Sequence, residues 1–506
     1  MEQVQLAEIY HAETKYHEAQ MNKYQRKLDW TAQPLPYKNY HSEKKIALVS
    51  HLPFRRNPLT GDPLTPAQEE GGYPIGRGEL SRLLYFTHGV TGVLQYVTGE
   101  KLFLRAAPTA GGLYPTEMYV AIRDIAGLES GIYNFQAREH CLAPVWEGDF
   151  WSEFERYCMR HEAIAQAHLL IIMTAVYQRS AWRYQERAYR RILLDTGHII
   201  GNLTTYASCE GFTPYVMGGF FDGALNRLLF LDESEEGVLA VIALPQSARI
   251  NPNTIRQTSA PASCRSATLE ERSLQLQLHA ASSIAPDENR EETWDPPPPF
   301  DTLESRYATH SALPLTQCLT DLGEDEMRQA ILRRRSTRAY TGEAFSADQL
   351  SSILSYAYAP FFSSPLPLFA PSLLSTYVIL QNVEEWQAGI YYYAPQSLSL
   401  RQLVEGDFRR QIWHCCLGQE IARDAAAVVI HVAHLKTALA LHGDRAYRYL
   451  HMDAGQIGER LNLAAIHLGL GASGIGGFYD DEVNMLLECS LDHIAVYITT
   501  LGVPRA

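Results

Sequence analysis

The segment RRRSTR at 333–338 contains Arg334, Arg335, Ser336 and Arg338. Guanidinium groups and a hydroxyl supply the directed, charge-assisted donors that a buried phosphate dianion needs. A solvated basic run at a helix end is the more common origin of such a segment. The serine between the arginines favours phosphate binding.

A second segment, RAAPTAGGLYPTE, begins at Arg105 and places small residues ahead of a β-rich run. The candidate cofactor-binding residues in it are Arg105, Pro108, Thr109, Ala110 and Gly111. One interpretation is a plain turn that enters a strand. The other is a backbone that lies close against a flat ligand, where a Cβ would collide.

The composition excludes several function classes. The formal net charge of -14 argues against a general binder of nucleic acids or acidic membranes. The eight cysteines form no CxxC pair and the histidines show no metal-ligand spacing, so we expect neither a metal site nor a disulfide framework. The N-terminus lacks a signal-peptide pattern and no apolar run approaches the length of a membrane span. We expect a reduced, cytoplasmic protein.

The elements that must position these segments occur twice. The passage ERAYRRILLD begins at Glu186, and the similar passage DRAYRYLHMD begins 258 positions later at Asp444. At the same separation, the GGF that begins at Gly218 aligns with the GGF that begins at Gly476. Two copies of this size predict two domains packed about a pseudo-twofold axis, like a homodimer fused into one chain.

The repeat divides the chain into four segments. We predict an N-terminal extension at 1–70, a first domain at 71–250, a Pro-rich connector at 251–325 and a second domain at 326–506. Pro296–Pro299 favour polyproline II, so we expect the connector to run extended over the surface. The N-terminal extension has no evident counterpart in the second copy.

Each copy has the same predicted order of elements. A helix is followed by a strand, a short GIY strand, a buried strand, a long helix from RAYR, a glycine-rich turn and a closing strand, which gives an α+β domain. The expected ranges in the two copies are 78–89 and 346–359 for the first helix, 117–122 and 375–380 for the first strand, 168–176 and 426–434 for the buried strand, and 238–244 and 494–502 for the closing strand.

These motifs together resemble the nitroreductase-like FMN oxidoreductases, and within them the SagB-type dehydrogenases that oxidise azoline rings in modified peptides. RAAPTAGGLYPTE is similar to the family stretch Arg-x-x-Pro-Ser-x-Gly-x-x-Tyr-Pro-x-Glu, and RRRSTR to the family opening Arg-Arg-Ser-x-Arg. The segments GIYNF, WRYQERAYR, GGF and YHAETKY add to the resemblance. It implies two tandem nitroreductase-like, FMN-dependent domains that form an intrachain pseudo-dimer.

The resemblance also implies where FMN would bind. In the family, the arginine–serine segment holds the phosphate, and the later glycine turn, here Ile475, Gly476 and Gly477, faces the ring. The partner domain lays the backbone of its Pro-Ser-Gly loop against the isoalloxazine, so main-chain N–H groups and the Thr109 hydroxyl are expected at the ring edge. Arg505, after the last strand, either reaches the phosphate or lies in a frayed tail.

Each copy lacks a different half of the residues that the family uses to bind FMN. The second copy keeps the arginine–serine segment, whereas the first has LTPAQ at 64–68 in the equivalent place. The first copy keeps the glycines, whereas Phe369 aligns with Gly111 in the second. We therefore predict one FMN per chain, bound between the copies, and a vestigial mirror-related site.

The catalytic pair departs from the family pattern. Azoline dehydrogenases carry Lys-Tyr where this chain has Arg183 and Tyr184. Arginine does not deprotonate in proteins, so Arg183 cannot be a general base. It can lower the pKa of the neighbouring phenol, which would make Tyr184 the base. The paired Arg187 and Arg445 are expected to be structural, buried against carboxylates.

We predict an FMN-dependent oxidoreductase that transfers a substrate hydride to FMN N5. The resemblance implies a thiazoline or oxazoline substrate, with a cyclodehydratase and a precursor peptide as partners. Two alternatives stay open: an NAD(P)H-dependent nitro, quinone or flavin reductase, and a non-catalytic flavin- or peptide-binding scaffold. Residues 1–70 either help to grip a leader peptide or wrap the core.

Overall fold

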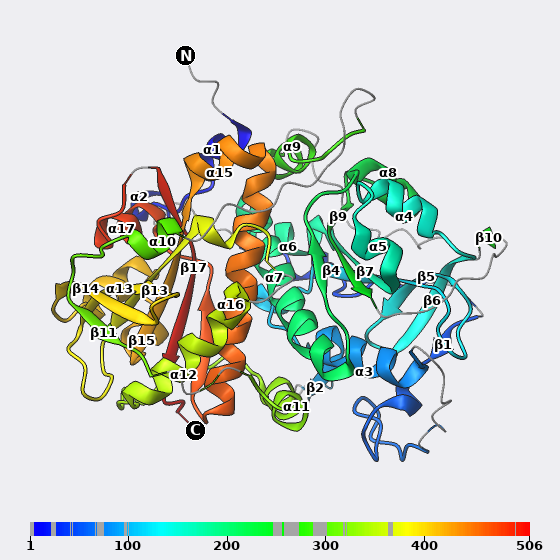
Figure 1. The fold of residues 1–506 in the computed structure, drawn as a ribbon, viewed down its shortest axis with the longest axis horizontal. Helices are drawn as coiled ribbons and strands as arrows, with labels where there is room; N and C mark the ends of the chain where they lie inside the picture. Colours follow the sequence, from blue (N-terminus) through cyan, green and yellow to red (C-terminus); the bar gives the residue numbers. More distant parts are fainter. Residues whose placement is uncertain are drawn as a thin grey trace.

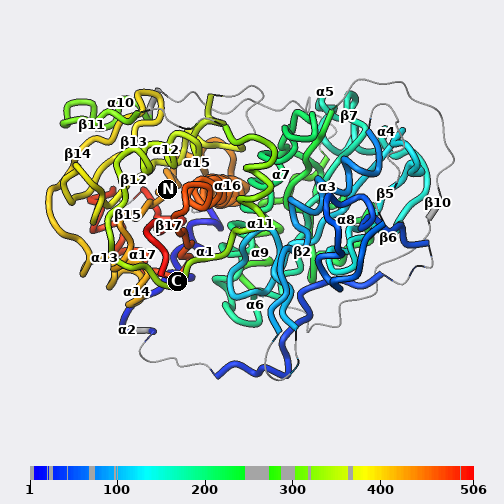
Figure 2. The backbone as a smooth tube through the Cα atoms, turned by 90° about the horizontal axis from the view of Figure 1, so that it is seen from below, coloured from blue at the N-terminus to red at the C-terminus, as the bar shows by residue number. Residues whose placement is uncertain are grey.

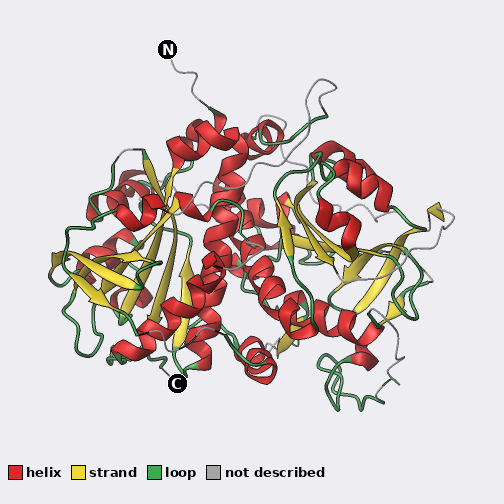
Figure 3. Ribbon diagram, in the orientation of Figure 1, coloured by secondary structure: helices red, strands yellow, loops and turns green. Residues whose placement is uncertain are grey.

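Two antiparallel sheets, one from each half of the chain, flank a central layer of helices (Figures 1 and 3). The computed structural model describes residues 5–21, 27–40, 42, 44–65, 67, 75–95, 99, 101–245, 256–257, 273–286, 301–316, 319, 321–362, 368–490 and 492–505. The pseudo-dimer of two α+β domains that the repeat predicts is the observed architecture.

The two sheets have matching strand orders. The first runs β1-β6-β5-β4-β7-β9-β8 with β10 on β6, and the second runs β11-β14-β13-β12-β15-β17-β16. The strands of the first sheet are β1 (Ile46–Ala47), β4 (Thr116–Ile122), β5 (Gly131–Gln136), β6 (Cys141–Glu147), β7 (Ala167–Val176), β8 (Tyr215–Met217), β9 (Glu236–Pro245) and β10 (Arg256–Gln257). Those of the second are β11 (Ala312–Pro314), β12 (Leu374–Leu380), β13 (Gly389–Ala394), β14 (Ser399–Glu405), β15 (Ala427–His434), β16 (Gly471–Ile475) and β17 (His493–Gly502). A hairpin of β2 (Val90–Gln95) and β3 (Lys101–Arg105) stands apart.

The longest helices, α7 (Ala188–Ala207) and α16 (Ala446–His467), cross at the centre of the molecule (Figure 1). At the crossing, a Cβ on Gly197 would lie 2.2 Å from the carbonyl oxygen of Met452, and a Cβ on Gly455 would lie 2.4 Å from that of Leu194. Glycine at both positions therefore allows the two backbones to touch, and the crossing marks the pseudo-twofold axis.

The remaining helices surround this pair and the sheets. In the first half they are α1 (Leu6–Glu13), α2 (Glu18–Met21), α3 (Arg77–His88), α4 (Trp151–Tyr157), α5 (Glu162–Gln166), α6 (Tyr177–Tyr184) and α8 (Asp222–Leu228). They continue with α9 (Leu274–Ala281), α10 (Asp301–Ser305), α11 (Glu324–Arg333), α12 (Ala347–Tyr358), α13 (Arg409–Cys415), α14 (Glu420–Arg423), α15 (Leu435–His442) and α17 (Asp480–Leu486). No helix among the described residues combines the length and the apolarity that a bilayer crossing requires.

Buried apolar side chains form one shared core and two outer ones. The largest cluster joins both halves and includes Leu193 of α7 and Leu450 of α16. The outer clusters cover the far faces of the two sheets, with Phe154 of α4 in one and Ile412 of α13 in the other. Because burial of each such side chain contributes roughly 1.5–3 kcal/mol, the shared core binds the halves into one body.

One described part of the connector, residues 273–286, contains the partly buried helix α9 and is not an extended surface segment. Leu278 and His279 of α9 are fully covered. The expectation of an extended surface connector is therefore wrong for residues 273–286, because α9 packs against α1 and its His279 carbonyl binds Arg448 of α16. Pro296–Pro299 lie outside the described residues.

Helix α9 is the counterpart of α1 across the axis. The carbonyl oxygen of His11 accepts a hydrogen bond of 2.6 Å from Arg190, and that of His279 accepts one of 2.8 Å from Arg448. The first helix of the N-terminal extension thus has a counterpart ahead of the second copy, contrary to the sequence-based expectation. The N-terminal extension contacts both halves of the molecule: Ala7 binds Asp444 of the second half, and Lys38 binds Glu236 of the first. It is the blue segment in Figure 2.

A change of offset hides this match in the sequence. His11 and His279 are 268 positions apart, whereas β4 and β12 begin 258 positions apart, at Thr116 and Leu374. The first copy therefore has additional residues ahead of β4, in the stretch that contains the β2–β3 hairpin.

Candidate functional site

A cavity of about 290 Å³ lies between the two halves. Its lining comes from the first half through Pro108, Thr109, Ala110, Gly111, Tyr184, Arg191, Leu194, Asp195 and His198, and from the second through Ser336, Arg338, Leu417, Gln419, Gly474, Ile475, Gly476, Gly477 and Tyr497. The loop, the arginine–serine segment and the glycine turn that the sequence singled out thus meet at one site. The contacts of FMN with them stay a prediction.

The loop of the first half is held by Asp195 of α7. The Thr109 hydroxyl donates to Asp195 Oδ2 at 2.5 Å and the Ala110 N–H donates to Oδ1 at 3.1 Å. These two donors therefore face the protein, whereas the sequence analysis expected them at the edge of a ligand. The difference arises because Asp195, buried directly beneath the loop, competes for them.

Burial raises the pKa of Asp195 to about 7, although its hydrogen bonds to Thr109 and Ala110 oppose the shift. Gly111 adopts a φ of +69°, a left-handed conformation that favours glycine. A Cβ there would also lie 2.8 Å from the Tyr184 hydroxyl oxygen. The loop therefore requires glycine both for its backbone and for the approach of Tyr184.

The four residues of the arginine–serine segment divide into two pairs. Ser336 and Arg338 line the cavity, and Arg338 has no hydrogen-bond or ion-pair partner among the residues that the structure describes. Arg334 and Arg335 instead bind the first half. Arg334 Nε donates to the Ala106 carbonyl at 2.6 Å, and Arg335 donates to the Thr91 carbonyl at 3.0 Å. This second pair ties the halves together beside the cavity.

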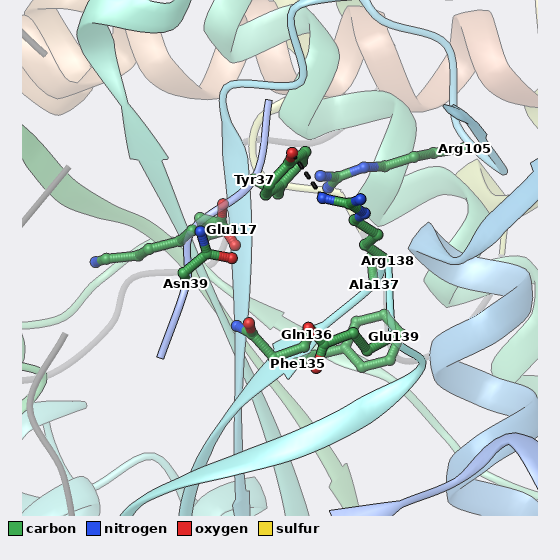
Figure 4. Close-up of a pocket in the computed structure, with 10 residues that line it drawn as sticks. Tyr37, Asn39, Arg105, Glu117, Phe135, Gln136, Ala137, Arg138 and Glu139 are labelled. Atoms are coloured by element: carbon green, nitrogen blue, oxygen red, sulfur yellow. Dashed lines mark hydrogen bonds between the residues drawn. The ribbon is translucent and has the colours of Figure 1, made fainter. Parts of the chain in front are cut away.

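Two further candidates lie away from the cavity lining. The Arg105 guanidinium binds the Pro36 carbonyl and lines a separate pocket of about 10 Å³, where Figure 4 shows it near Tyr37 and Arg138. A pocket of that size holds about one water molecule. The exposed Arg505 is fixed through its backbone N–H, which donates to the Ala339 carbonyl at 2.9 Å.

Sequence reasoning missed Arg191, which lies against the glycine turn. A Cβ on Gly476 would lie 2.9 Å from one terminal nitrogen of Arg191, and a Cβ on Gly477 would lie 3.3 Å from the other. The guanidinium also lies 4.0 Å from the centre of the Tyr184 ring. The sequence does carry a signal for this residue: the 258-residue repeat aligns Arg191 with Tyr449, so the two copies differ at this position.

Tyr184 keeps its proton at neutral pH. Burial raises its pKa, and the opposing effects of Arg191 and Arg183 offset only part of that shift. The expectation that Arg183 makes this phenol a base by lowering its pKa is therefore not met. The reason is that Arg183 is exposed and lies 5.7 Å from the ring centre, where solvent screens its charge.

The mirror-related position is filled by two aromatic rings. Phe369 stacks on Tyr449, with ring centres 5.3 Å apart and planes within 8°. A Cβ on Gly218, the equivalent of Gly476, would lie 2.5 Å from the Tyr449 ring. The glycine pair thus has a fold role in both copies, which is to admit the side chain at position 191 or 449.

The mirror loop has its own carboxylate. Asp453 accepts from the N–H groups of Phe369 at 2.9 Å and Ala370 at 2.7 Å. Ala370 therefore takes the place of Ala110, two positions from where the 258-residue alignment puts it. Burial raises the pKa of Asp453 to about 7, as it does for Asp195.

The recurring arginines are structural, as expected. Arg187 forms an ion pair of 2.6 Å with Asp480, and Arg445 forms one of 2.7 Å with Asp222. All four side chains are buried. The ring of Tyr16, from the N-terminal segment, covers the Arg187 guanidinium at 4.2 Å and helps to close this side of the molecule.

Comparison with known proteins identifies the class. The chain belongs to the nitroreductase family, which matches residues 73–244 and again residues 331–503. A crystal structure of an Anabaena variabilis protein assigned as a nitroreductase covers 99% of this chain and 100% of that one, with 38% identity and a TM-score of 0.85. The protein is thus an oxidoreductase of the nitroreductase type with two such domains in tandem.

Two curated relatives match single stretches of the chain. A Methanocaldococcus jannaschii protein assigned as a nitroreductase is 29% identical over 160 residues, which are 32% of this chain and 77% of that protein. The trifolitoxin-processing protein TfxB of Rhizobium leguminosarum bv. trifolii is 33% identical over 166 residues, or 30% of this chain. The chain spans 42% of the length of TfxB.

Proposed function

We propose that the protein binds one FMN per chain in the cavity between its halves and carries out two-electron redox chemistry there. The observation that carries this proposal is the asymmetry of the two positions. On one side of the axis, the loop at Pro108–Gly111, Arg338 and the glycine turn at 475–477 line an open cavity. On the other side, Phe369 and Tyr449 fill the equivalent space.

The lining fits the parts of FMN. Arg338, without a partner among the described residues, and the Ser336 hydroxyl would hold the phosphate through charge-assisted hydrogen bonds. The main chain at Gly476 and Gly477 and the loop at Pro108–Gly111 would face the flat ring, since neither presents a large side chain there. When bound, FMN supplies a centre that accepts or releases two electrons with a proton.

The protein itself has to supply or accept the proton that accompanies electron transfer. Tyr184 lines the cavity, and its raised pKa keeps the phenol protonated at neutral pH. A protonated phenol can donate to an oxygen or nitrogen of a substrate that is being reduced. In the opposite direction, oxidation of a C–H bond beside a heteroatom, as in an azoline ring, Tyr184 would have to accept a proton.

Two directions of reaction therefore compete. The SagB-type resemblance and the similarity to TfxB support oxidation of a ring in a modified peptide, with a precursor peptide and a cyclodehydratase as partners. The raised pKa of Tyr184 favours the second candidate, an NAD(P)H-dependent reductase of a nitro or quinone compound.

Two measurements test these proposals. A visible spectrum during titration with FMN should show tight binding that saturates at one FMN per chain, and a ratio of two or no binding contradicts the single site. With FMN bound and oxygen excluded, bleaching by NAD(P)H alone supports the reductase. Bleaching by an azoline peptide alone supports the dehydrogenase.

A further inference from the structure

We propose that Arg191 forms a carboxylate-binding subsite in this cavity, so that the substrate is a flat organic molecule that carries a carboxylate. The inference rests on the proposed function, because it assigns a substrate to the same site. It concerns the part of the cavity beside Tyr184, apart from Ser336 and Arg338.

Arg191 is a buried cation that forms no ion pair with the residues that the structure describes. Only 8% of the residue is exposed, yet it lines the cavity. Among the described residues, its Nε has no hydrogen-bond partner, and the one hydrogen bond that its guanidinium makes is a long one of 3.4 Å to the Tyr16 hydroxyl. No carboxylate of the described residues forms an ion pair with it. A buried guanidinium in this state is costly unless a ligand completes its contacts.

The one carboxylate in the lining does not fill this role. Both oxygens of Asp195 accept hydrogen bonds, from the Thr109 hydroxyl and the Ala110 N–H. That carboxyl is also largely committed to the loop rather than to Arg191. Among the described residues, no carboxylate therefore completes the contacts of Arg191, which leaves them to an anionic ligand.

The surroundings of Arg191 favour a planar anion. The Tyr184 ring covers one face of the guanidinium at 4.0 Å, and Gly476 and Gly477 lie against its terminal nitrogens. Nη1 has no hydrogen-bond partner among the described residues, and the bond from Nη2 to Tyr16 is long, so an anion that enters the cavity can bind these N–H groups. A carboxylate does so through two parallel hydrogen bonds.

The second half provides an internal comparison. The mirror-related position holds Tyr449 in place of Arg191, and there the tyrosine fills the space with Phe369. The neighbouring arginines that support the fold are kept in both halves, as Arg187 with Arg445 and Arg190 with Arg448. An arginine is therefore present at this position only in the half that lines the open cavity, whereas the arginines that stabilise the fold are present in both halves.

Calorimetric titration of the FMN-loaded protein with benzoate and with its neutral analogue benzamide tests the subsite. We expect benzoate to bind and benzamide to bind at least tenfold more weakly. Arg191→Gln and Arg191→Tyr, the second being the residue of the mirror position, should weaken benzoate at least tenfold and leave FMN affinity within twofold. Arg191→Lys should fall between, and Arg227→Gln, on an exposed arginine of α8, should match the wild type.

Two results would overturn the inference. Benzoate affinity that is the same in Arg191→Gln and wild type excludes the subsite. A loss of FMN affinity as large as the loss of benzoate affinity makes Arg191 a flavin ligand instead. If the protein binds no FMN, the proposed function fails, but the same titration on the flavin-free protein still decides whether Arg191 binds a carboxylate.

Discussion

Asp222 and Asp480 lie 258 positions apart and each binds two arginines of the opposite half. Asp222 pairs with Arg445 and Arg448, each at 2.7 Å, and Asp480 pairs in the same way with two arginines of α7 at 2.6 Å. Each carboxylate also accepts a backbone N–H from the segment that follows α9 or α1. The two halves and the two N-terminal helices are therefore fastened at equivalent points.

The first prediction concerns these fastenings. Asp480→Asn leaves two buried guanidinium groups without a counter-ion, and we expect it to lower the unfolding free energy by roughly 3–5 kcal/mol at pH 7. The Arg187 and Arg190 pairs hold the pKa of Asp480 well below its usual range, so its stabilisation is present above pH 4 and is lost as the pH falls below that. Urea denaturation at pH 7 and pH 3.5 measures both effects. Asp325→Asn, at a fully exposed aspartate, is the control and should change stability by less than about 0.5 kcal/mol.

The second prediction concerns the helix crossing. Gly197→Ala brings a Cβ within 2.2 Å of the Met452 carbonyl oxygen, so α7 and α16 must move apart. We expect the free energy of unfolding, measured by heat or urea, to fall by about 1–3 kcal/mol, which is the usual cost of overpacking. Gly223→Ala on α8 meets only the flexible ends of Arg227 and Glu233 and should be neutral. Equal stability of both variants would contradict the backbone contact.

The third prediction concerns the phosphate end of the cavity. Arg338→Ala should weaken FMN binding about 10- to 100-fold, because one charge-assisted contact contributes roughly 1.5–3 kcal/mol. Riboflavin lacks the phosphate, so its affinity should not change. Arg410→Ala, at an exposed arginine of α13, serves as the control in the same fluorescence titration. A parallel loss for riboflavin would place Arg338 at the ring instead.

The fourth prediction compares the twin carboxylates beneath the two loops. The pKa of Asp195 in the folded protein, about 7, lies above its ordinary value of 3.8. The folded state therefore favours the protonated form, and stability falls as the pH rises from about 4 to 7. In Asp195→Asn this fall should be absent, which raises its stability relative to wild type by at most roughly 4 kcal/mol above pH 7.

Asp453→Asn is the matched variant, because Asp453 has the same environment at the filled position. Both variants should show the same pH profile of stability, measured by urea unfolding between pH 4 and 8. Only Asp195→Asn should alter FMN affinity. An effect of Asp453→Asn on FMN binding would indicate that the second position also takes part.

The fifth prediction concerns Tyr184. Tyr184→Phe keeps the ring that Arg191 covers but removes the hydroxyl, so turnover should fall about 10²- to 10⁴-fold while FMN affinity is retained. As a proton donor with a raised pKa, Tyr184 should give an activity that stays level from pH 6 to 9 and declines only above pH 10. Activity that increases steadily across this range would identify a base instead.

The sequence predicted most of the fold because local patterns carry it. The β-branched run at 168–176 and the strand at 117–122 appear as β7 and β4 within one residue. The helix α9 was missed since its match to α1 depends on two arginines far away in the chain rather than on residue similarity.

The candidate site was predicted by segment and not by side chain. The pattern RRRSTR does not reveal that Arg334 reaches the Ala106 carbonyl while Arg338 lies at the cavity, because the backbone path decides it. Likewise, Asp195 captures the Ala110 N–H over 85 positions of sequence. Backbone donors look alike at every residue, so no residue pattern announces such a contact.

Covalent fusion of the two domains removes a constraint that binds every symmetric dimer. Where two identical subunits meet, each mutation appears twice, and a side chain useful to one wall of a cleft must also be tolerated on the opposite wall. Here Arg191 and Tyr449 are inherited separately. The position of Arg191 can thus change to suit a ligand while the position of Tyr449 changes to stabilise the fold. Because one gene encodes both domains, they are always made in equal amounts.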